Sequence, residues 1–123
     1  MKSEEYKEQC TFAQWLNIKK IPFFHIPNGG KRGVLEASRL KKMGVKAGIP
    51  DIFIHVPVDP YAGLFVEMKK KKGGSLSLSQ KLKIVELNAL GYCALTAEGC
   101  DEAIKITEAY LKLMDKDKRV CVG

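Results

Sequence analysis

Two acidic residues and a lysine stand where two predicted strands can bring them together. Asp51 opens one predicted strand, and Glu67 and Lys69 belong to a second, residues 64–69. Because side chains alternate along a strand, Glu67 and Lys69 share one face. If the two strands pair through the turn at residues 57–63, Asp51 comes close to Glu67.

This set of side chains is typical of metal-assisted hydrolysis. Two neighbouring carboxylates repel each other unless a proton or a cation lies between them. Mg²⁺ prefers such oxygen ligands and also accepts phosphate oxygens, and the backbone carbonyl of Met68 can supply a third protein oxygen. Lys69 can orient or deprotonate a water beside the cation and neutralise developing charge. The pattern therefore predicts hydrolysis of a phosphodiester by Asp51, Glu67 and Lys69.

The specificity of this signal comes from the combination of its parts. A Glu-x-Lys pattern alone also fits an exposed, ion-pairing strand edge. Here it follows Gly48-Ile49-Pro50-Asp51, in which Pro50 stiffens the backbone and Gly48 permits a close approach. Two other classes stay open at this point. One is a nucleic-acid-binding module without cleavage, whose acids only bridge lysines, and the other is an interaction protein whose charge serves solubility.

Positive charge surrounds the acidic motifs. The chain has a net charge of +7, and residues 31–46 and 69–83 hold 12 of its 21 Lys and Arg residues but a single acid, Glu36. Such a distribution is typical of a polyanion-binding surface. Phosphate contacts from these segments would position DNA without reading its sequence. The candidate DNA-binding residues are Lys31, Arg32, Lys41, Lys42, Lys46, Lys70, Lys71 and Lys72.

The hydrophobic pattern predicts one α/β domain over residues 1–123, with a small mixed β-sheet flanked by helices. Capping residues, glycines and apolar periodicity mark the ends of the elements. The expected helices are 4–19, 35–43, a third from Ser77 or Ser79 to about Leu90, and 100–114. The expected strands are 23–26, 51–56, 64–69 and 92–96.

The two histidines have less specific interpretations. His25 ends the predicted strand 23–26 and could contact the scissile phosphate, but a strand-end residue paired with solvent or backbone is the favoured interpretation. His55 follows Asp51 on its strand and is interpreted as structural.

Several classes of protein do not fit the composition. No apolar run approaches the ~20 residues that span a bilayer, and the polar, acidic N-terminus does not fit a signal peptide. The four cysteines, Cys10, Cys93, Cys100 and Cys121, have neither disulfide-framework nor zinc-site spacing. We therefore expect a protein of the reducing cytoplasm, not secreted and without a membrane partner.

The motifs resemble those of the PD-(D/E)xK nuclease superfamily, and specifically of its virus-type replication-repair nuclease (VRR-NUC) domain, over most of the chain. Gly48-Ile49-Pro50-Asp51 is similar to the family's Gly-x-Pro-Asp, and Glu67-Met68-Lys69 to its Glu-x-Lys. Ser79-Gln80 is similar to the Ser-Gln element of its third helix. The segment from His25 to Arg32 also resembles the stretch before Gly-x-Pro-Asp in phage members.

The resemblance implies a restriction-endonuclease-like core and a set of roles. Asp51 and Glu67 would bind Mg²⁺ or Mn²⁺, Lys69 would be catalytic and Gln80 would support the site. The family also has an acid and a Gln on its first helix, for which Glu5 with Gln9 fits one helical face and Glu8 is a rival acid. Stand-alone members are similar to dimeric endonucleases that cut branched DNA such as Holliday junctions, whereas a fused eukaryotic member acts on flaps as a monomer.

Overall fold

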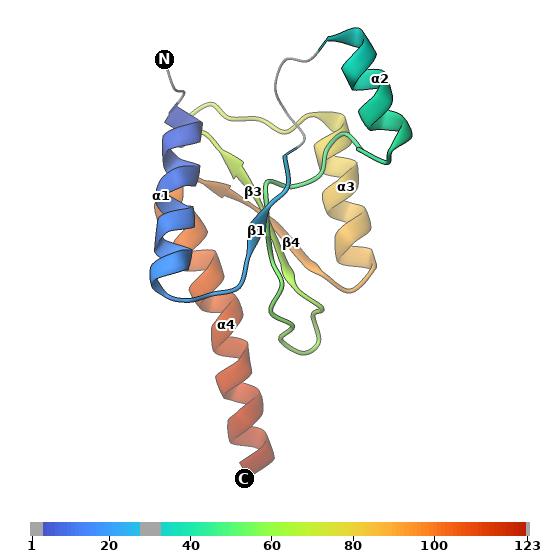
Figure 1. The fold of residues 1–123 in the computed structure, drawn as a ribbon. Coiled ribbons are helices and arrows are strands. Elements are labelled where there is room, and N and C mark those ends of the chain that lie inside the picture. The colour runs from blue at the N-terminus through green and yellow to red at the C-terminus, as the bar shows by residue number, and fades with distance from the viewer. Residues whose placement is uncertain (1–3, 28–32, 123) are drawn as a thin grey trace.

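Helices and strands alternate along the chain in the computed structural model, which describes residues 4–27 and 33–122, with the side chains of 4–27 and 33–114 (Figure 1). The helices are α1 (Glu4–Ile18), α2 (Val34–Lys42), α3 (Leu78–Ala89) and α4 (Cys100–Val122). The strands are β1 (Phe24–His25), β2 (Ile52–Ile54), β3 (Leu64–Lys69) and β4 (Cys93–Glu98).

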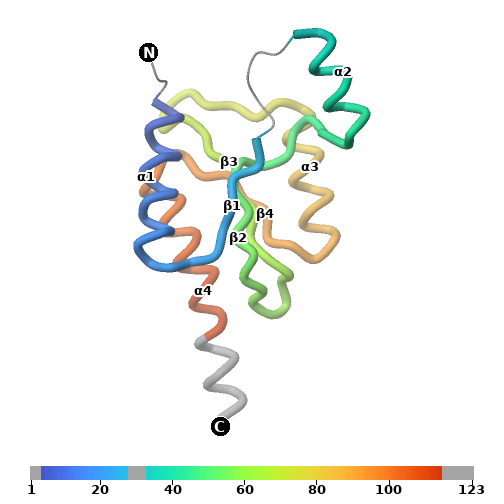
Figure 2. The backbone as a smooth tube through the Cα atoms, in the orientation of Figure 1, coloured from blue at the N-terminus to red at the C-terminus, as the bar shows by residue number. Residues whose placement is uncertain are grey.

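The four strands form one mixed sheet in the order β1-β2-β3-β4. The β1–β2 and β2–β3 pairs are antiparallel, and β3 and β4 are parallel, with α3 as the crossover between them. Helices α1 and α4 cover one face of the sheet, and α3 lies on the other (Figures 1 and 2). The predicted α/β class is confirmed, and the arrangement is consistent with a restriction-endonuclease-like core.

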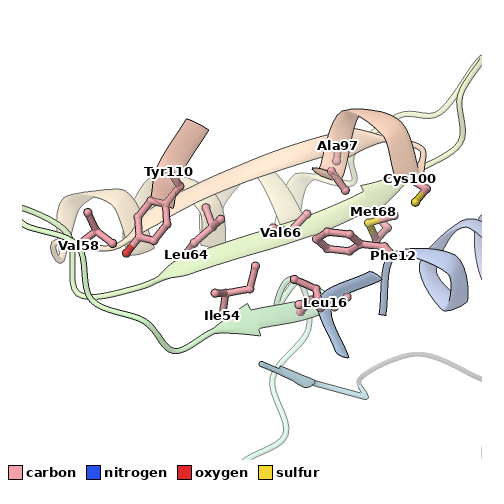
Figure 3. Packing of buried hydrophobic residues seen from close by; sticks show 12 residues of the cluster. Phe12, Leu16, Ile54, Val58, Leu64, Val66, Met68, Ala97, Cys100 and Tyr110 are labelled. Carbon is pink, nitrogen blue, oxygen red and sulfur yellow. The ribbon is translucent and has the colours of Figure 1, made fainter. Parts of the chain in front are cut away.

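The hydrophobic core lies between the sheet and the pair α1 and α4 (Figure 3). On β3, Leu64, Val66 and Met68 are fully buried in this core. Phe12 and Leu16 of α1 pack against them. Strand alternation sends the residues between them to the opposite face, which is the face that carries the predicted catalytic side chains.

Most element boundaries agree with the sequence prediction, and the largest difference lies at the end of α4. We expected this helix to end near residue 114, at the polar segment 115–119, but its backbone stays helical to Val122. No Gly or Pro occurs between Cys100 and Val122 to interrupt it. In the ranges 4–27 and 33–122, no helix is long and apolar enough to cross a membrane.

Candidate active site

Asp51 and Glu67 meet at the end of the β2–β3 pair. Ile52 lies opposite Val66 in this pair, so the next position places Asp51 opposite Glu67. Oδ2 of Asp51 accepts a hydrogen bond of 2.8 Å from the backbone N–H of Met68. The Glu67 side chain is buried, with 3% of the residue exposed. The structure thus brings together the two acids that the sequence predicted to approach each other.

Gly48 lets the segment before Asp51 pass closely over the start of α3. Its φ is +84°, and a Cβ at this position would lie 2.5 Å from the backbone oxygen of Ser79. Pro50, the residue before Asp51, is fully buried. A side chain at residue 48 would push the Asp51 segment away from α3, so the glycine sets the position of the acid relative to that helix.

The electrostatics of the pair favour a proton or a cation between the two carboxyl groups. Burial, the charge of Asp51 and a hydrogen bond to Asp51 together raise the pKa of Glu67 from 4.5 to about 9, while Lys69 opposes the shift. Without a cation, Glu67 is therefore protonated near neutral pH and donates to the Asp51 carboxylate. The other oxygen, Oε1, is buried and has no hydrogen-bond partner among the described residues.

These groups fit a hard divalent cation. Ionised, the two carboxylates offer oxygen ligands, and the unpartnered Oε1 of Glu67 is free to bind. The N–H and C=O of a strand residue point to the same edge, so the carbonyl of Met68 faces the Asp51 side as its N–H does. Within the described part of the chain, no group of three or more His, Cys, Asp or Glu side chains could hold a metal. A cation here would thus depend on backbone oxygen and water in addition to two acids.

Lys69 is held in place by the first turn of α3. Its Nζ donates to Oε1 of Gln80 at 3.1 Å, and the same oxygen accepts from the backbone N–H of Ser77 at 2.9 Å. Ser77 is the N-cap of α3 and its side chain accepts from the Gln80 N–H, which completes a capping box. Of the two predicted caps, Ser77 and Ser79, the structure uses Ser77.

The two candidate acids of α1 have different surroundings. Oε1 of Glu8 accepts a hydrogen bond of 2.9 Å from the backbone N–H of Cys100 and lies 3.5 Å from Nζ of Lys71. Glu8 therefore caps the start of α4. Glu5 acts electrostatically on Glu67 and lines, together with Lys69, a cavity of about 210 Å³. Of the two acids, Glu5 is the one beside the Asp51–Glu67 pair.

A solved structure named "VRR_NUC domain protein" is similar to this chain in fold and sequence. It is 32% identical to the chain, the match covers 92% of each chain, and the TM-score is 0.79. The chain belongs to the VRR-NUC domain family. No protein-family model and no curated protein matches it. The resemblance noted in the Gly-x-Pro-Asp and Glu-x-Lys motifs is thereby confirmed at the level of the family.

His25 contacts Asp51 and Gln9 of the candidate site, although its favoured interpretation placed it outside the site. Nδ1 of His25 lies 2.8 Å from the backbone oxygen of Asp51 and 2.9 Å from Nε2 of Gln9. The favoured interpretation of His25, a strand-end residue paired with the backbone, agrees with this contact. The sequence carried no signal that the partner would be Asp51, because the contact depends on the pairing of β1 with β2.

Six of the eight predicted DNA-binding residues lie in described segments at one end of the VRR-NUC domain. The loop after β3 crosses the same end of the molecule as α2 and the N-termini of α1 and α3 (Figure 1). Lys70, Lys71 and Lys72 on this loop are exposed, as are Lys41, Lys42 and Lys46 in and after α2. Lys31 and Arg32 lie outside the described residues.

Proposed function

We propose that this VRR-NUC domain is a metal-dependent endonuclease that hydrolyses phosphodiester bonds in DNA. The observation that carries the proposal is the pairing of Asp51 with the buried Glu67, in which one Glu67 oxygen has no partner among the described residues. Both carboxylates and the carbonyl of Met68 would hold Mg²⁺ or Mn²⁺. When bound, such a cation stabilises negative charge on phosphate and lowers the pKa of water.

Lys69 would act on the water and on the phosphate. Its bond to Gln80 keeps the ammonium group on the face of β3 that carries Glu67. From there it would orient the attacking water and neutralise the charge that develops on the phosphate. Gln80 would position Lys69, and Glu5 would complete the acidic side of the site beside Glu67. Glu8 has no part in this proposal, because its carboxylate caps α4.

The substrate we propose is DNA with a branch, of the Holliday-junction or flap type. Support comes from the six described lysines, which lie at the end of the molecule that holds the site, and from the family's stand-alone members. Contacts to phosphate would position the strand without reading bases. The three described cysteines, Cys10, Cys93 and Cys100, are free thiols, in keeping with our proposal of a cytoplasmic enzyme.

A cleavage panel tests this function. Labelled junction, flap, nicked, duplex and single-stranded DNA would each be incubated with Mg²⁺, Mn²⁺ or EDTA. We expect cleavage of branched substrates with either metal and none with EDTA. Cleavage in EDTA would contradict the metal mechanism. Salt-sensitive binding with every substrate left intact would instead favour a nucleic-acid-binding module without cleavage.

We infer that the enzyme acts as a homodimer through the outer face of α3. Leu78, Leu82 and Val85 are 72%, 60% and 66% exposed, and with Ala89 they form one stripe with spacings of four, three and four residues. This spacing reads the same in reverse, so two antiparallel copies match each apolar residue with another, as a two-fold interface requires. Leu82 of one copy then faces Val85 of the other, and Leu78 faces Ala89.

Sedimentation over a concentration series tests the dimer. Leu82→Glu should produce a monomer, because it introduces a charge at the centre of the stripe. Leu90→Glu is the matched control, since Leu90 is similarly exposed at the end of the same helix but lies off the stripe. A wild-type monomer at every concentration, or a dimer that survives Leu82→Glu, would contradict the interface and favour cutting of flaps or single branches.

A further inference from the structure

The contact between His25 and Asp51 defines which nitrogen of the imidazole carries hydrogen. Nδ1 of His25 is 2.8 Å from the backbone oxygen of Asp51. A carbonyl oxygen only accepts hydrogen bonds, so Nδ1 must carry hydrogen and donate. In the neutral ring the other nitrogen, Nε2, is then unprotonated.

Gln9 of α1 restrains the same ring. Its amide lies 2.9 Å from Nδ1 of His25. If Nδ1 carries hydrogen, the Gln9 amide nitrogen would face it as a second donor. Rotating the amide group by 180° exchanges its nitrogen and oxygen, so that Oε1 accepts the hydrogen of Nδ1. With Oε1 in that place, the Nδ1 hydrogen is shared between Gln9 and Asp51. Helix α1, strand β1 and Asp51 are thereby connected through one imidazole.

Asp51 is held at both its backbone and its side chain. Its backbone oxygen accepts a second hydrogen bond of 2.8 Å from the N–H of Ile26, and its carboxylate accepts from the N–H of Met68. The peptide is therefore fixed from β1 and the carboxylate from β3. Loss of the His25 bond would leave the backbone oxygen of Asp51 with the hydrogen bond from Ile26, and a small rotation of the peptide would move the carboxylate relative to Glu67.

We propose that His25 is a positioning residue that holds Asp51 through its Nδ1 hydrogen. Its effect on cation binding rests on the proposed nuclease function, but the hydrogen bond itself does not. Nε2, in this proposal, has no required partner. A role of Nε2 in contacting DNA phosphate is the competing explanation, and the experiments below separate the two.

The tautomer of His25 can be measured in the metal-free protein. Long-range ¹H–¹⁵N correlation spectra distinguish a protonated Nδ1 from a protonated Nε2, and His55, which is exposed, provides a second ring in the same spectrum. We expect the neutral form of His25 to carry its proton on Nδ1. A neutral ring protonated on Nε2 would overturn the proposal. This measurement decides the contact whether or not the wild-type protein cleaves DNA.

Isosteric substitutions test the function of the contact. Asn places an amide N–H near the position of Nδ1, whereas Gln places one near Nε2. We expect His25→Asn to keep wild-type behaviour, and His25→Gln and His25→Ala to weaken Mg²⁺ or Mn²⁺ binding by about 10–100-fold. Binding would be followed by the shift in melting temperature on titration with metal alone, and turnover would be measured in parallel. His55→Asn is the matched control and should change neither quantity.

Two outcomes of the substitutions would overturn the proposal. Equal losses in His25→Asn and His25→Gln would mean that an N–H at the Nδ1 position is not sufficient. Full activity of His25→Gln with loss in His25→Asn would assign the function to Nε2 and to the phosphate. If wild-type protein binds no cation and cleaves nothing, the nuclease proposal fails, and the tautomer measurement still stands as the test of the hydrogen bond.

Discussion

Two buried polar side chains, Thr107 and Glu67, differ in their hydrogen bonding. Thr107 of α4 is fully buried, and its hydroxyl donates a hydrogen bond of 2.8 Å to the backbone oxygen of Ala103. Glu67 of β3 is 3% exposed, and its Oε1 has no partner among the described residues. Buried polar atoms in folded proteins are nearly always paired. The buried hydroxyl of Thr107 is thus satisfied within its own helix, whereas Oε1 of Glu67, on the face of β3 beside Asp51, remains available to a ligand.

The largest effects on cleavage are expected from substitutions beside Glu67, where the unpaired oxygen lies. Lys69→Ala or Asp51→Asn should lower the rate of DNA cleavage by about 10²–10⁴-fold, since the first removes the group that we propose acts on water and phosphate and the second removes a proposed ligand of the cation. Circular dichroism should show an intact fold, and DNA binding should persist. Lys70→Ala is the control, because Lys70 is exposed and should contribute to binding alone. Cleavage that survives both substitutions at the site would rule out the mechanism.

A second effect concerns pH and stability. Burial and the neighbouring Asp51 raise the pKa of Glu67 from 4.5 to about 9, so between these values the folded protein retains a proton that the unfolded chain has lost. The free energy of unfolding of the metal-free protein should therefore fall as pH rises through this window. Urea unfolding in EDTA across a pH series measures the slope.

Glu67→Gln should remove that slope, because the amide mimics the protonated acid. Mg²⁺ should stabilise the wild-type protein at pH 8, because the cation displaces the proton of Glu67 and binds the carboxylate. The stability of Glu67→Gln should not respond to Mg²⁺, since the amide cannot ionise. A slope that persists in Glu67→Gln would place its origin at another residue.

The two acids of α1 should separate activity from stability. Glu8→Ala removes the side chain that caps α4 and pairs with Lys71, so it should lower the free energy of unfolding by about 1 kcal/mol. Cleavage by that variant should be unchanged. Glu5→Ala should leave stability unchanged and reduce metal affinity or turnover by about 10-fold. The reverse pattern would assign Glu8 to the site.

The smallest effect is expected at Thr107, whose hydroxyl is already paired. Thr107→Val keeps the shape of the side chain and removes one satisfied hydrogen bond, so it should change the free energy of unfolding by about 1 kcal/mol or less. Neither cleavage nor the response to Mg²⁺ should change. A metal response altered by Thr107→Val would show that the two regions are coupled through the sheet.

Local patterns were sufficient to predict that Asp51 and Glu67 lie close together, at the centre of the candidate site. The alternation of Leu64, Val66 and Met68 with Glu67 and Lys69 follows from strand geometry. The short connection favours pairing of their strand with that of Asp51. Strands β2 and β3 are consecutive in the chain, and their register places Asp51 opposite Glu67.

Long-range contacts account for what the sequence left open. Glu5 and Glu8 lie three residues apart on α1, and their environments differ because Cys100, at the start of α4, approaches Glu8. Nothing in a local pattern predicts that approach. The bond between His25 and Asp51 is of the same kind, because it arises from the pairing of β1 with β2. Gln80 was identified by resemblance alone, and its shared oxygen became visible only in the structure.

In the proposed mechanism, the shared oxygen of Gln80 makes the position of Lys69 depend on the integrity of a helix end. The same Oε1 completes the capping box of α3 and accepts from Lys69, so fraying of the first turn of α3 releases the lysine. Helix ends fray at lower free-energy cost than whole domains unfold. Activity should thus decline on warming before the sheet melts, and a substrate that packs against the first turn of α3 would activate the enzyme by suppressing that local melting.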